Sequence, residues 1–191
     1  MTPTAHRPQM LVEEFEELAR TAPDTVTLEF INGKLEVKPV PDGDHDEIIM
    51  WVQERCMQQR PDLRLYRERG LRVESYRNGR ARPDGALAPP RHFTGHGEWS
   101  DAAGVLMVVE VASHDTDTDQ RDRLEECVGY AGAAIPVYLL IDRDDCSLTV
   151  HSDPCDGKYG STTTRRYGTT VELPSPVGMA LETDALKDFV R

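Results

Sequence analysis

The sequence predicts a mixed α/β domain with a central sheet flanked by helices. Two apolar, valine- and isoleucine-containing runs, 105–113 (VLMVVEVAS) and 135–142 (IPVYLLID), predict buried strands on either side of a helical segment. This strand–helix–strand order is typical of a βαβ unit. A length of 191 residues is enough for one domain with a sizeable core, so we expect a single domain over residues 1–191.

The N-terminal third predicts a helix, a hairpin and a second helix. Residues 10–20 place apolar side chains at helical spacing, namely Leu11, Phe15, Leu18 and Ala19. Residues 26–40 form two alternating runs joined by Asn32-Gly33, a pair that favours a type I′ turn. Residues 41–60 follow with a helical pattern, and its apolar face consists of Ile48, Trp51, Val52 and Cys56.

The rest of the chain predicts short strands and two more helices. Ahead of the buried pair, strands are expected at 63–67, 71–76 and 82–88. The acidic segment 113–120 suits a helix N-terminus, where the helix dipole favours negative charge. The stripe of this helix that we expect to face the core is Leu124, Cys127, Val128 and Ala131. Towards the C-terminus we expect strands at 147–152 and near 167–173, and a helix at 184–190.

The charge balance counts against a general DNA-binding protein. The net charge is −12, and an acidic chain is repelled by nucleic acid as a whole. Residues 60–82 nevertheless hold eight arginines against three acids. Two interpretations of this segment stay open, a solvated strand face, which we favour, and a patch that faces phosphates.

Cysteine usage and hydropathy indicate a cytoplasmic protein without a structural metal. No apolar run is long enough to cross a bilayer, and the N-terminus lacks the pattern of a signal peptide. The four cysteines show no CxxC pair, so we expect reduced thiols and no zinc site. His92 and His96 lie in a glycine-rich stretch rather than on a helix, which does not favour a metal role.

Glu110 is the residue that the strand pattern does not explain. Alternation places it on the same face as Leu106 and Val108, and an unpaired buried carboxylate costs several kcal/mol. Three explanations stay open: the strand reaches solvent there, an arginine pairs with Glu110, or the site exists to hold that charge.

Asp84, in the stretch RPDG, offers a second carboxylate just before another apolar run. Two carboxylates on neighbouring strands could hold Mg²⁺, which prefers oxygen ligands and commonly takes one or two protein carboxylates. The sequence Pro83-Asp84-Gly85 is also a strong turn signal, so spacing alone leaves the metal site and the turn as alternatives.

The ordered set of these motifs resembles a known family. The order PD, a gap of 25 residues, EVAS, an acid-rich helix start and YAGAAIPVYLLID, preceded by LEFINGKLEVKP and His45, is similar to the bacterial Uma-type restriction endonuclease family. That family belongs to the PD-(D/E)XK nuclease superfamily. The resemblance implies a restriction-endonuclease-like core with a central mixed sheet, an N-terminal helix and a β-hairpin. It also implies a homodimeric endonuclease that uses Mg²⁺ or Mn²⁺ to hydrolyse phosphodiester bonds of DNA.

The resemblance also implies roles for individual residues. Asp84 and Glu110 correspond to the metal ligands, and the carbonyl of Val111 to a third ligand. Glu29 would have an outer-shell or second-metal role, and His45 would orient substrate or water. For these last two residues, an exposed hairpin position and a helix-start polar group are the alternatives.

The chain departs from the family pattern at its lysine. The usual superfamily position, two residues after the glutamate, is Ala112, and the Uma-type position on the next helix is Glu126, four residues before Tyr130. The four lysines of the chain, none of which lies in these segments, are Lys34, Lys38, Lys158 and Lys187. Arg121 or Arg123 could supply charge, but a guanidinium is a poor base. Two hypotheses therefore stand, a metal-dependent endonuclease and a catalytically weak or inactive nuclease-fold protein that binds nucleic acid or a protein partner.

Overall fold

The computed structural model describes residues 10–38, 40–73, 79–112 and 119–189, and within the third α-helix the side chains from Leu124 onward. The first half contains α1 (Val12–Thr21), β1 (Thr27–Ile31), β2 (Lys34–Lys38), α2 (Gly43–Gln59), β3 (Arg64–Arg67), β4 (Leu71–Val73), β5 (Gly79–Ala81), β6 (Gly85–Ala88) and β7 (Ser100–Asp101). The second half contains β8 (Met107–Ala112), α3 (Asp119–Gly132), β9 (Val137–Asp142), β10 (Ser147–Cys155), β11 (Lys158–Arg166), β12 (Thr170–Leu173), β13 (Met179–Glu182) and the 3₁₀ helix η1 (Thr183–Phe189).

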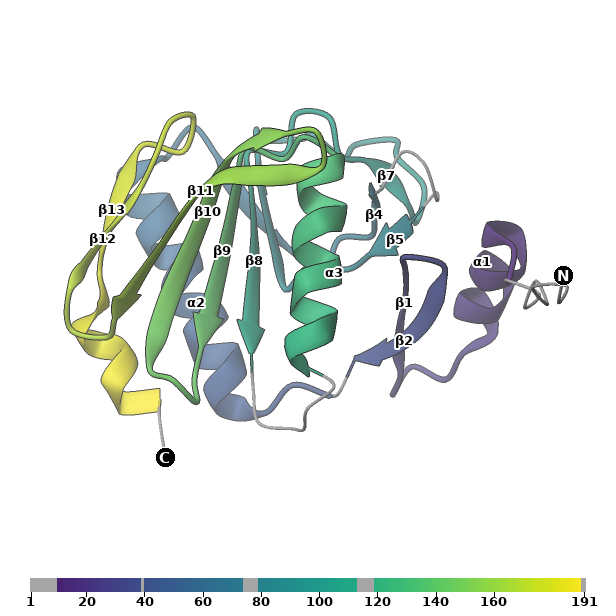
Figure 1. Ribbon diagram of the computed structural model, residues 1–191, viewed down its shortest axis with the longest axis horizontal. Coiled ribbons are helices and arrows are strands. Elements are labelled where there is room, and N and C mark those ends of the chain that lie inside the picture. The colour runs from purple at the N-terminus through teal and green to yellow at the C-terminus, as the bar shows by residue number, and fades with distance from the viewer. Residues whose placement is uncertain (1–9, 39, 74–78, 113–118, 190–191) are drawn as a thin grey trace, which may run out of the picture.

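A six-stranded mixed sheet forms the centre of the fold, in the order β11-β10-β9-β8-β6-β3. Strands β8 and β9 pair in parallel and α3 connects them, so the predicted βαβ unit is confirmed. The other described pairs in this sheet are antiparallel. The predicted mixed α/β class, with mixed sheets flanked by helices, is confirmed as well (Figure 1).

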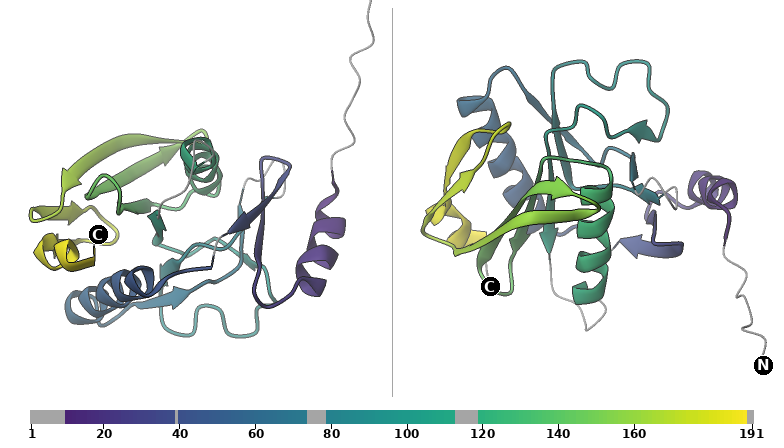
Figure 2. Two further views of the ribbon diagram at one scale, coloured as in Figure 1. Left: turned by 90° about the horizontal axis from the view of Figure 1, so that it is seen from below. Right: turned by 45° about the horizontal axis from the view of Figure 1, so that its top comes forward.

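Helices α2 and α3 cover opposite faces of this sheet (Figures 1 and 2). On β8, Met107 and Val109 belong to the core cluster that contains Ile48 of α2, as alternation predicts. Val108 belongs to the cluster that contains Tyr130 of α3. The side chain of Glu110, two residues further on, therefore lies on the α3 side.

A second sheet of five strands, in the order β2-β1-β5-β4-β7, carries the N-terminal hairpin. Helix α1 packs on it through Phe15, whose ring stacks on Phe30 with the centroids 5.3 Å apart. The turn residues Asn32 and Gly33 both have positive φ, 52° and 73°, as a type I′ turn requires. The hairpin prediction is confirmed.

Besides the expected central sheet, the described residues form the five-stranded sheet and a two-stranded sheet of β12 and β13. The predicted strand 82–88 is wrong in its first half, because β5 ends at Ala81 in one sheet and β6 starts at Gly85 in the other. Residues 82–84 cross between the two sheets, and Asp84 therefore lies at their junction. Of the predicted strand 71–76, β4 covers Leu71–Val73, and residues 74–78 lie outside the described part.

Two predictions of buried helix faces are wrong in part. On α3, Leu124 and Val128 are 68% and 51% exposed, whereas Tyr130 and Ala131 are buried. The helix turns the face of Glu126 and Tyr130 inward because it covers Glu110 rather than an all-apolar surface. On α1, the fully buried residue is Phe15, while Leu11 and Leu18 are exposed.

The ends of the predicted elements differ slightly from those observed. The C-terminal helix is a 3₁₀ helix over Thr183–Phe189, and the acidic segment 113–118 ahead of α3 lies outside the described residues. In the described part of the chain, no helix has the length and apolarity that a membrane span needs.

Candidate active site

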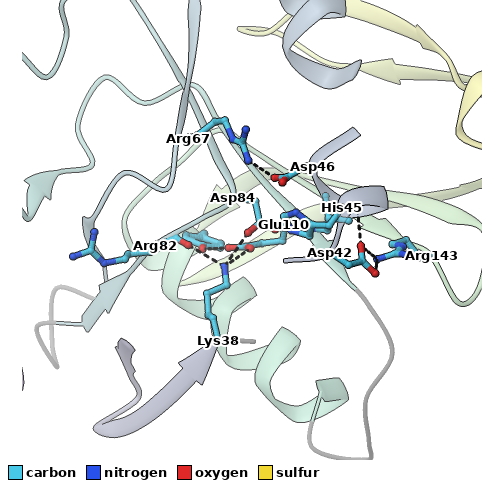
Figure 3. A network of polar contacts seen from close by, with 11 residues as sticks. Lys38, Asp42, His45, Asp46, Arg67, Arg82, Asp84, Glu110 and Arg143 are labelled. Atoms are coloured by element: carbon cyan, nitrogen blue, oxygen red, sulfur yellow. Dashed lines mark hydrogen bonds and ion pairs between the residues drawn. The ribbon is translucent and has the colours of Figure 1, made fainter. Parts of the chain in front are cut away.

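Asp84 and Glu110 converge on one point, which the ammonium group of Lys38 occupies (Figure 3). The Nζ atom of Lys38 lies 2.8 Å from Oε2 of Glu110 and 3.4 Å from Oδ1 of Asp84. It also donates a hydrogen bond of 2.9 Å to the carbonyl of Arg82. Two carboxylates far apart in the sequence, on β8 and at the junction of the sheets, therefore face a single cation.

Asp84 is held from its other side by the protein. Its Oδ2 accepts a hydrogen bond of 2.8 Å from the backbone N–H of Val111 and lies 3.1 Å from Nε2 of His45. Burial alone would raise the pKa of Asp84, but Lys38, His45 and the Val111 N–H favour the carboxylate and hold the pKa well below its usual range. Asp84 is thus an ionised and oriented carboxylate.

Glu110 is 5% exposed, and both of its oxygens have partners. Oε2 faces Lys38, and Oε1 accepts a hydrogen bond from the hydroxyl of Tyr130 on α3. Burial raises the pKa of Glu110 to about 8, against the lowering influence of Lys38. The partners that a buried carboxylate requires are therefore a lysine and a tyrosine, and not an arginine.

Lys38, the last residue of β2, lies at the site although it belongs to the hairpin. The hairpin register pairs Glu29 with Glu36 and Thr27 with Lys38, which places Glu29, Glu36 and Lys38 on one face. Polar residues of β2 point towards α3, while Leu35 and Val37 are 40% and 62% exposed. The two family positions for the lysine are Ala112 and Glu126, as the sequence indicates, and the lysine at the site is Lys38 of the hairpin, from outside those segments.

The electrostatic setting of Lys38 favours its charge. Burial opposes the ammonium, but the carboxylates of Asp84, Glu110 and Glu29 outweigh this effect and hold its pKa well above the ordinary value for lysine. A sequence signal for this position did exist. Once Glu29 is assigned to the site, the Asn32-Gly33 turn fixes a register that places the side chains of Glu36 and Lys38 on the same face.

Glu29 is buried beside the two carboxylates and is not an exposed hairpin residue. Its side chain accepts a hydrogen bond from the backbone N–H of Arg82. Burial raises the pKa of Glu29, although Lys38 and Arg82 lower it. Carboxylate oxygens of Glu29, Glu36 and Glu126 also lie within 4.8 Å of one another, so acids from the hairpin and from α3 gather next to the site.

His45 serves both the helix and the site. Its backbone N–H donates a hydrogen bond of 2.8 Å to Oδ1 of Asp42, the N-cap residue of α2. Its side chain is largely buried and directs Nε2 at Asp84. The position at the helix start directs the ring at Asp84, and a role in orienting substrate or water stays a prediction.

Most arginines described in the segment 60–82 have partners within the chain. Ion pairs join Arg60 to Asp62, Arg67 to Asp46, Arg80 to Glu16 and Arg82 to Glu98. These acids neutralise much of the local positive charge, which weakens the interpretation as a free phosphate-facing patch. The side chains of Arg121 and Arg123 lie outside the described part.

The donor set fits a hard divalent cation. Each carboxylate has one oxygen fixed by the protein, Oδ2 of Asp84 and Oε1 of Glu110, and turns the other towards the shared position of the ammonium. Carboxylate oxygens are the ligands that Mg²⁺ prefers. Val111 contacts Asp84 through its N–H, and the ligand role of its carbonyl stays a prediction.

Comparisons with known proteins identify the fold and the family of this chain. A crystal structure described as "a putative nuclease belonging to DUF820" from Anabaena variabilis is similar in fold, with a TM-score of 0.67 and 19% identity, over 94% of this chain and 98% of the other. None of the curated proteins compared with the chain matches it. A model of the Uma2 family, described as "Putative restriction endonuclease", matches residues 12–185, and the chain therefore belongs to the Uma2 family.

Proposed function

We propose that this protein is a metal-dependent endonuclease that hydrolyses phosphodiester bonds of DNA. The observation that carries the proposal is the meeting of Asp84 and Glu110 around a single positive charge in a largely buried site. Membership of the Uma2 family supports nuclease chemistry, and the carboxylate pair supports dependence on Mg²⁺ or Mn²⁺.

The proposed cation is held by Asp84 and Glu110, with the carbonyl of Val111 as a further ligand. When bound, such a cation polarises a phosphoryl oxygen and lowers the pKa of a water molecule. The protein contributes orientation, because the Val111 N–H and His45 hold Asp84, and Tyr130 holds Glu110. Nδ1 of His45 is buried without a hydrogen-bond partner among the described residues, so this atom is the one that could bind water or substrate.

A binding protein without cleavage activity is the second candidate. The observation that favours it is the internal salt bridge, since Lys38 already neutralises charge between the two carboxylates. In this case the fold would bind nucleic acid or a protein partner, and the carboxylates would serve the ion pair alone. The two candidates differ in what a divalent cation does to the protein.

Thermal unfolding with and without Mn²⁺ or Mg²⁺ tests the cation site. A cation present at 100 times its Kd stabilises the native state by about 2.7 kcal/mol, and we expect the Tm of the wild type to rise accordingly. The double variant Asp84→Ala/Glu110→Ala should lose this rise. The variant Glu54→Ala/Glu172→Ala removes the same charge from exposed positions and should keep it.

Nicking of supercoiled plasmid DNA with Mn²⁺ tests the reaction. We expect cleavage by the wild type and by the exposed-acid control, and none by the Asp84/Glu110 double variant. A wild type without any cation-dependent rise in Tm would refute the cation site. A cation-dependent rise without cleavage of DNA would keep the cation site and refute the proposed reaction, and cleavage that survives in the double variant would place the reaction elsewhere.

A further inference from the structure

We propose that Lys38 is a catalytic residue of this site, and that its ammonium group contacts the phosphoryl oxygens of the substrate during hydrolysis. The inference rests on the proposed function. The two family positions for a lysine, Ala112 on β8 and Glu126 on α3, carry no positive charge. The inference gives this role to a residue of the N-terminal hairpin.

The contacts of Lys38 single it out among the described lysines. Its side chain is 20% exposed and bound to two carboxylates and one carbonyl, which uses its three hydrogens. Lys34 pairs instead with Glu125 at 2.5 Å, and Lys187 pairs with Asp184 at 2.6 Å. Within the described residues, Lys38 is thus the lysine that reaches Asp84 and Glu110.

The ammonium of Lys38 occupies the position that a divalent cation would take, so it has to move when the cation and a substrate bind. A cation between Asp84 and Glu110 competes for the oxygens that now face Nζ. A lysine has four methylene groups and a mobile head, so Nζ can move aside while the base of its side chain remains beside the site. A substrate phosphate bound at the cation offers the displaced ammonium a new negative partner, beside the carboxylates of Glu29 and Glu126 that also lie next to the site.

The reaction needs such a charge. In hydrolysis a water oxygen bonds to phosphorus and the bond from phosphorus to one sugar oxygen breaks. The water gives up its proton to solvent, and the leaving oxygen takes one from solvent. Negative charge gathers on the phosphoryl oxygens, and a positioned cationic donor stabilises it. Lys38 is not consumed, and its part in the step is to donate hydrogen bonds and positive charge to the phosphoryl oxygens.

A substitution at Glu126 on α3 can test whether a positive charge from another element replaces that of Lys38. Glu126 lies one turn before Tyr130, whose hydroxyl holds Glu110, so both side chains lie on one helix face. Carboxylate oxygens of Glu126 and of the hairpin residues Glu29 and Glu36 lie within 4.8 Å of one another, so the hairpin and the helix approach the site together. A lysine introduced at position 126 would therefore be directed at the same carboxylates.

The test compares plasmid nicking in Mn²⁺ for the wild type, Lys38→Met, Lys38→Arg and the double variant Lys38→Met/Glu126→Lys. We expect a loss of about 100-fold for Lys38→Met, the scale seen when one charge-stabilising donor is removed. Lys38→Arg should retain part of the rate, since it keeps the charge. The double variant should recover at least tenfold over Lys38→Met. The matched control is Lys34→Met, from the same strand, and its rate should be unchanged.

A second readout separates catalysis from support of the carboxylates. The rise in Tm with Mn²⁺ should be kept or enlarged in Lys38→Met, because the ammonium no longer competes for the ligands. If Lys38→Met loses both the rise in Tm and the cleavage of DNA, Lys38 only holds Asp84 and Glu110 in place, and the inference is overturned. Cleavage by Lys38→Met at the wild-type rate would overturn it as well.

The failures of the two proposals can be told apart. A wild type that shows neither a cation-dependent rise in Tm nor cleavage refutes the proposed function, and the inference on Lys38 falls with it. A wild type that responds to cation and cleaves, beside an equally active Lys38→Met, refutes the inference alone. If Lys38→Met does not fold, the double variant decides, and a folded double variant below about 1% of the wild-type rate is evidence against the inference.

Discussion

The hydroxyl of Tyr130 is the part of the site whose contribution to stability can be isolated most cleanly. Tyr130 is fully buried and donates to Glu110, which is itself 5% exposed. Tyr130→Phe deletes this donor and keeps the ring, which packs edge-on against Tyr138 with the centroids 5.2 Å apart. The change therefore leaves a buried carboxylate oxygen without its partner and creates little cavity.

The expected cost follows from the kind of hydrogen bond that is lost. A hydrogen bond to a charged group contributes about 1.5 to 3 kcal/mol, so above pH 8, where Glu110 is ionised, the free energy of unfolding should fall by about this amount. For a protein of this length, each kcal/mol changes the Tm by roughly 2 to 4 °C, which predicts a Tm lower by about 3 to 12 °C. The assay is thermal unfolding followed by circular dichroism, without divalent cations.

Tyr138→Phe is the matched control. Tyr138 is equally buried and belongs to the same aromatic cluster, yet its hydroxyl has no hydrogen-bond partner among the described residues. Removing an unsatisfied buried hydroxyl should leave the Tm unchanged or raise it. If Tyr138→Phe costs as much as Tyr130→Phe, or if Tyr130→Phe costs nothing, the hydrogen bond to Glu110 does not have the energetic weight assigned to it.

Three further predictions concern the elements around the site, each measured as the free energy of unfolding in urea. Phe15→Ala should cost about 3 to 5 kcal/mol, because Phe15 is fully buried against Phe30, and a loss below 1 kcal/mol would show that α1 is not held by this contact. Asp42→Ala should cost about 1 kcal/mol through loss of the α2 cap, and Asp42→Asn less, whereas equal losses would exclude capping as the cause. The backbone N–H of His45 lowers the pKa of Asp42, so this contribution is present above the unfolded pKa and disappears as the pH falls through the folded one. Val128→Lys should change stability by no more than about 0.5 kcal/mol because Val128 is half exposed. A larger loss would show that Val128 faces the core, as the sequence pattern predicts.

The parts of the fold that could be predicted are those with strong local signals. Strands β8 and β9 are continuous apolar runs, and the Asn32-Gly33 turn has one favoured geometry, so the βαβ unit and the hairpin follow from the sequence. The division into separate sheets could not be predicted in this way. It depends on residues 82–84, where the chain leaves one sheet for another, and the turn signal at Pro83-Asp84-Gly85 does not say which sheet each neighbouring strand joins.

The candidate site could also be predicted only in part. Alternation places Glu110 on one face of its strand, and spacing left its pairing with Asp84 and a turn at Asp84 as alternatives, between which the resemblance to a family favoured the pairing. Lys38 was missed because hydrophobic alternation in β2 is inverted, with Leu35 and Val37 outside and the charged residues inside. Binary patterning assumes that a buried face is apolar, and this assumption fails where the buried face lines a polar site.

The apolar residues of β2 lie outside and its charged residues inside because its inner face lies against other charged residues. Asp84 and Glu110 lie next to three further acids of the hairpin and α3: Glu29, Glu36 and Glu126. An apolar face would leave these carboxylates without a counter-charge, which costs more than exposing two aliphatic side chains at the sheet edge. One ammonium group does not balance five acids, and burial raises the pKa of Glu29, Glu110 and Glu126, which favours their protonated forms. The divalent cation proposed above would supply the missing positive charge and favour the carboxylate forms, and Lys38 would then have to leave the position between Asp84 and Glu110.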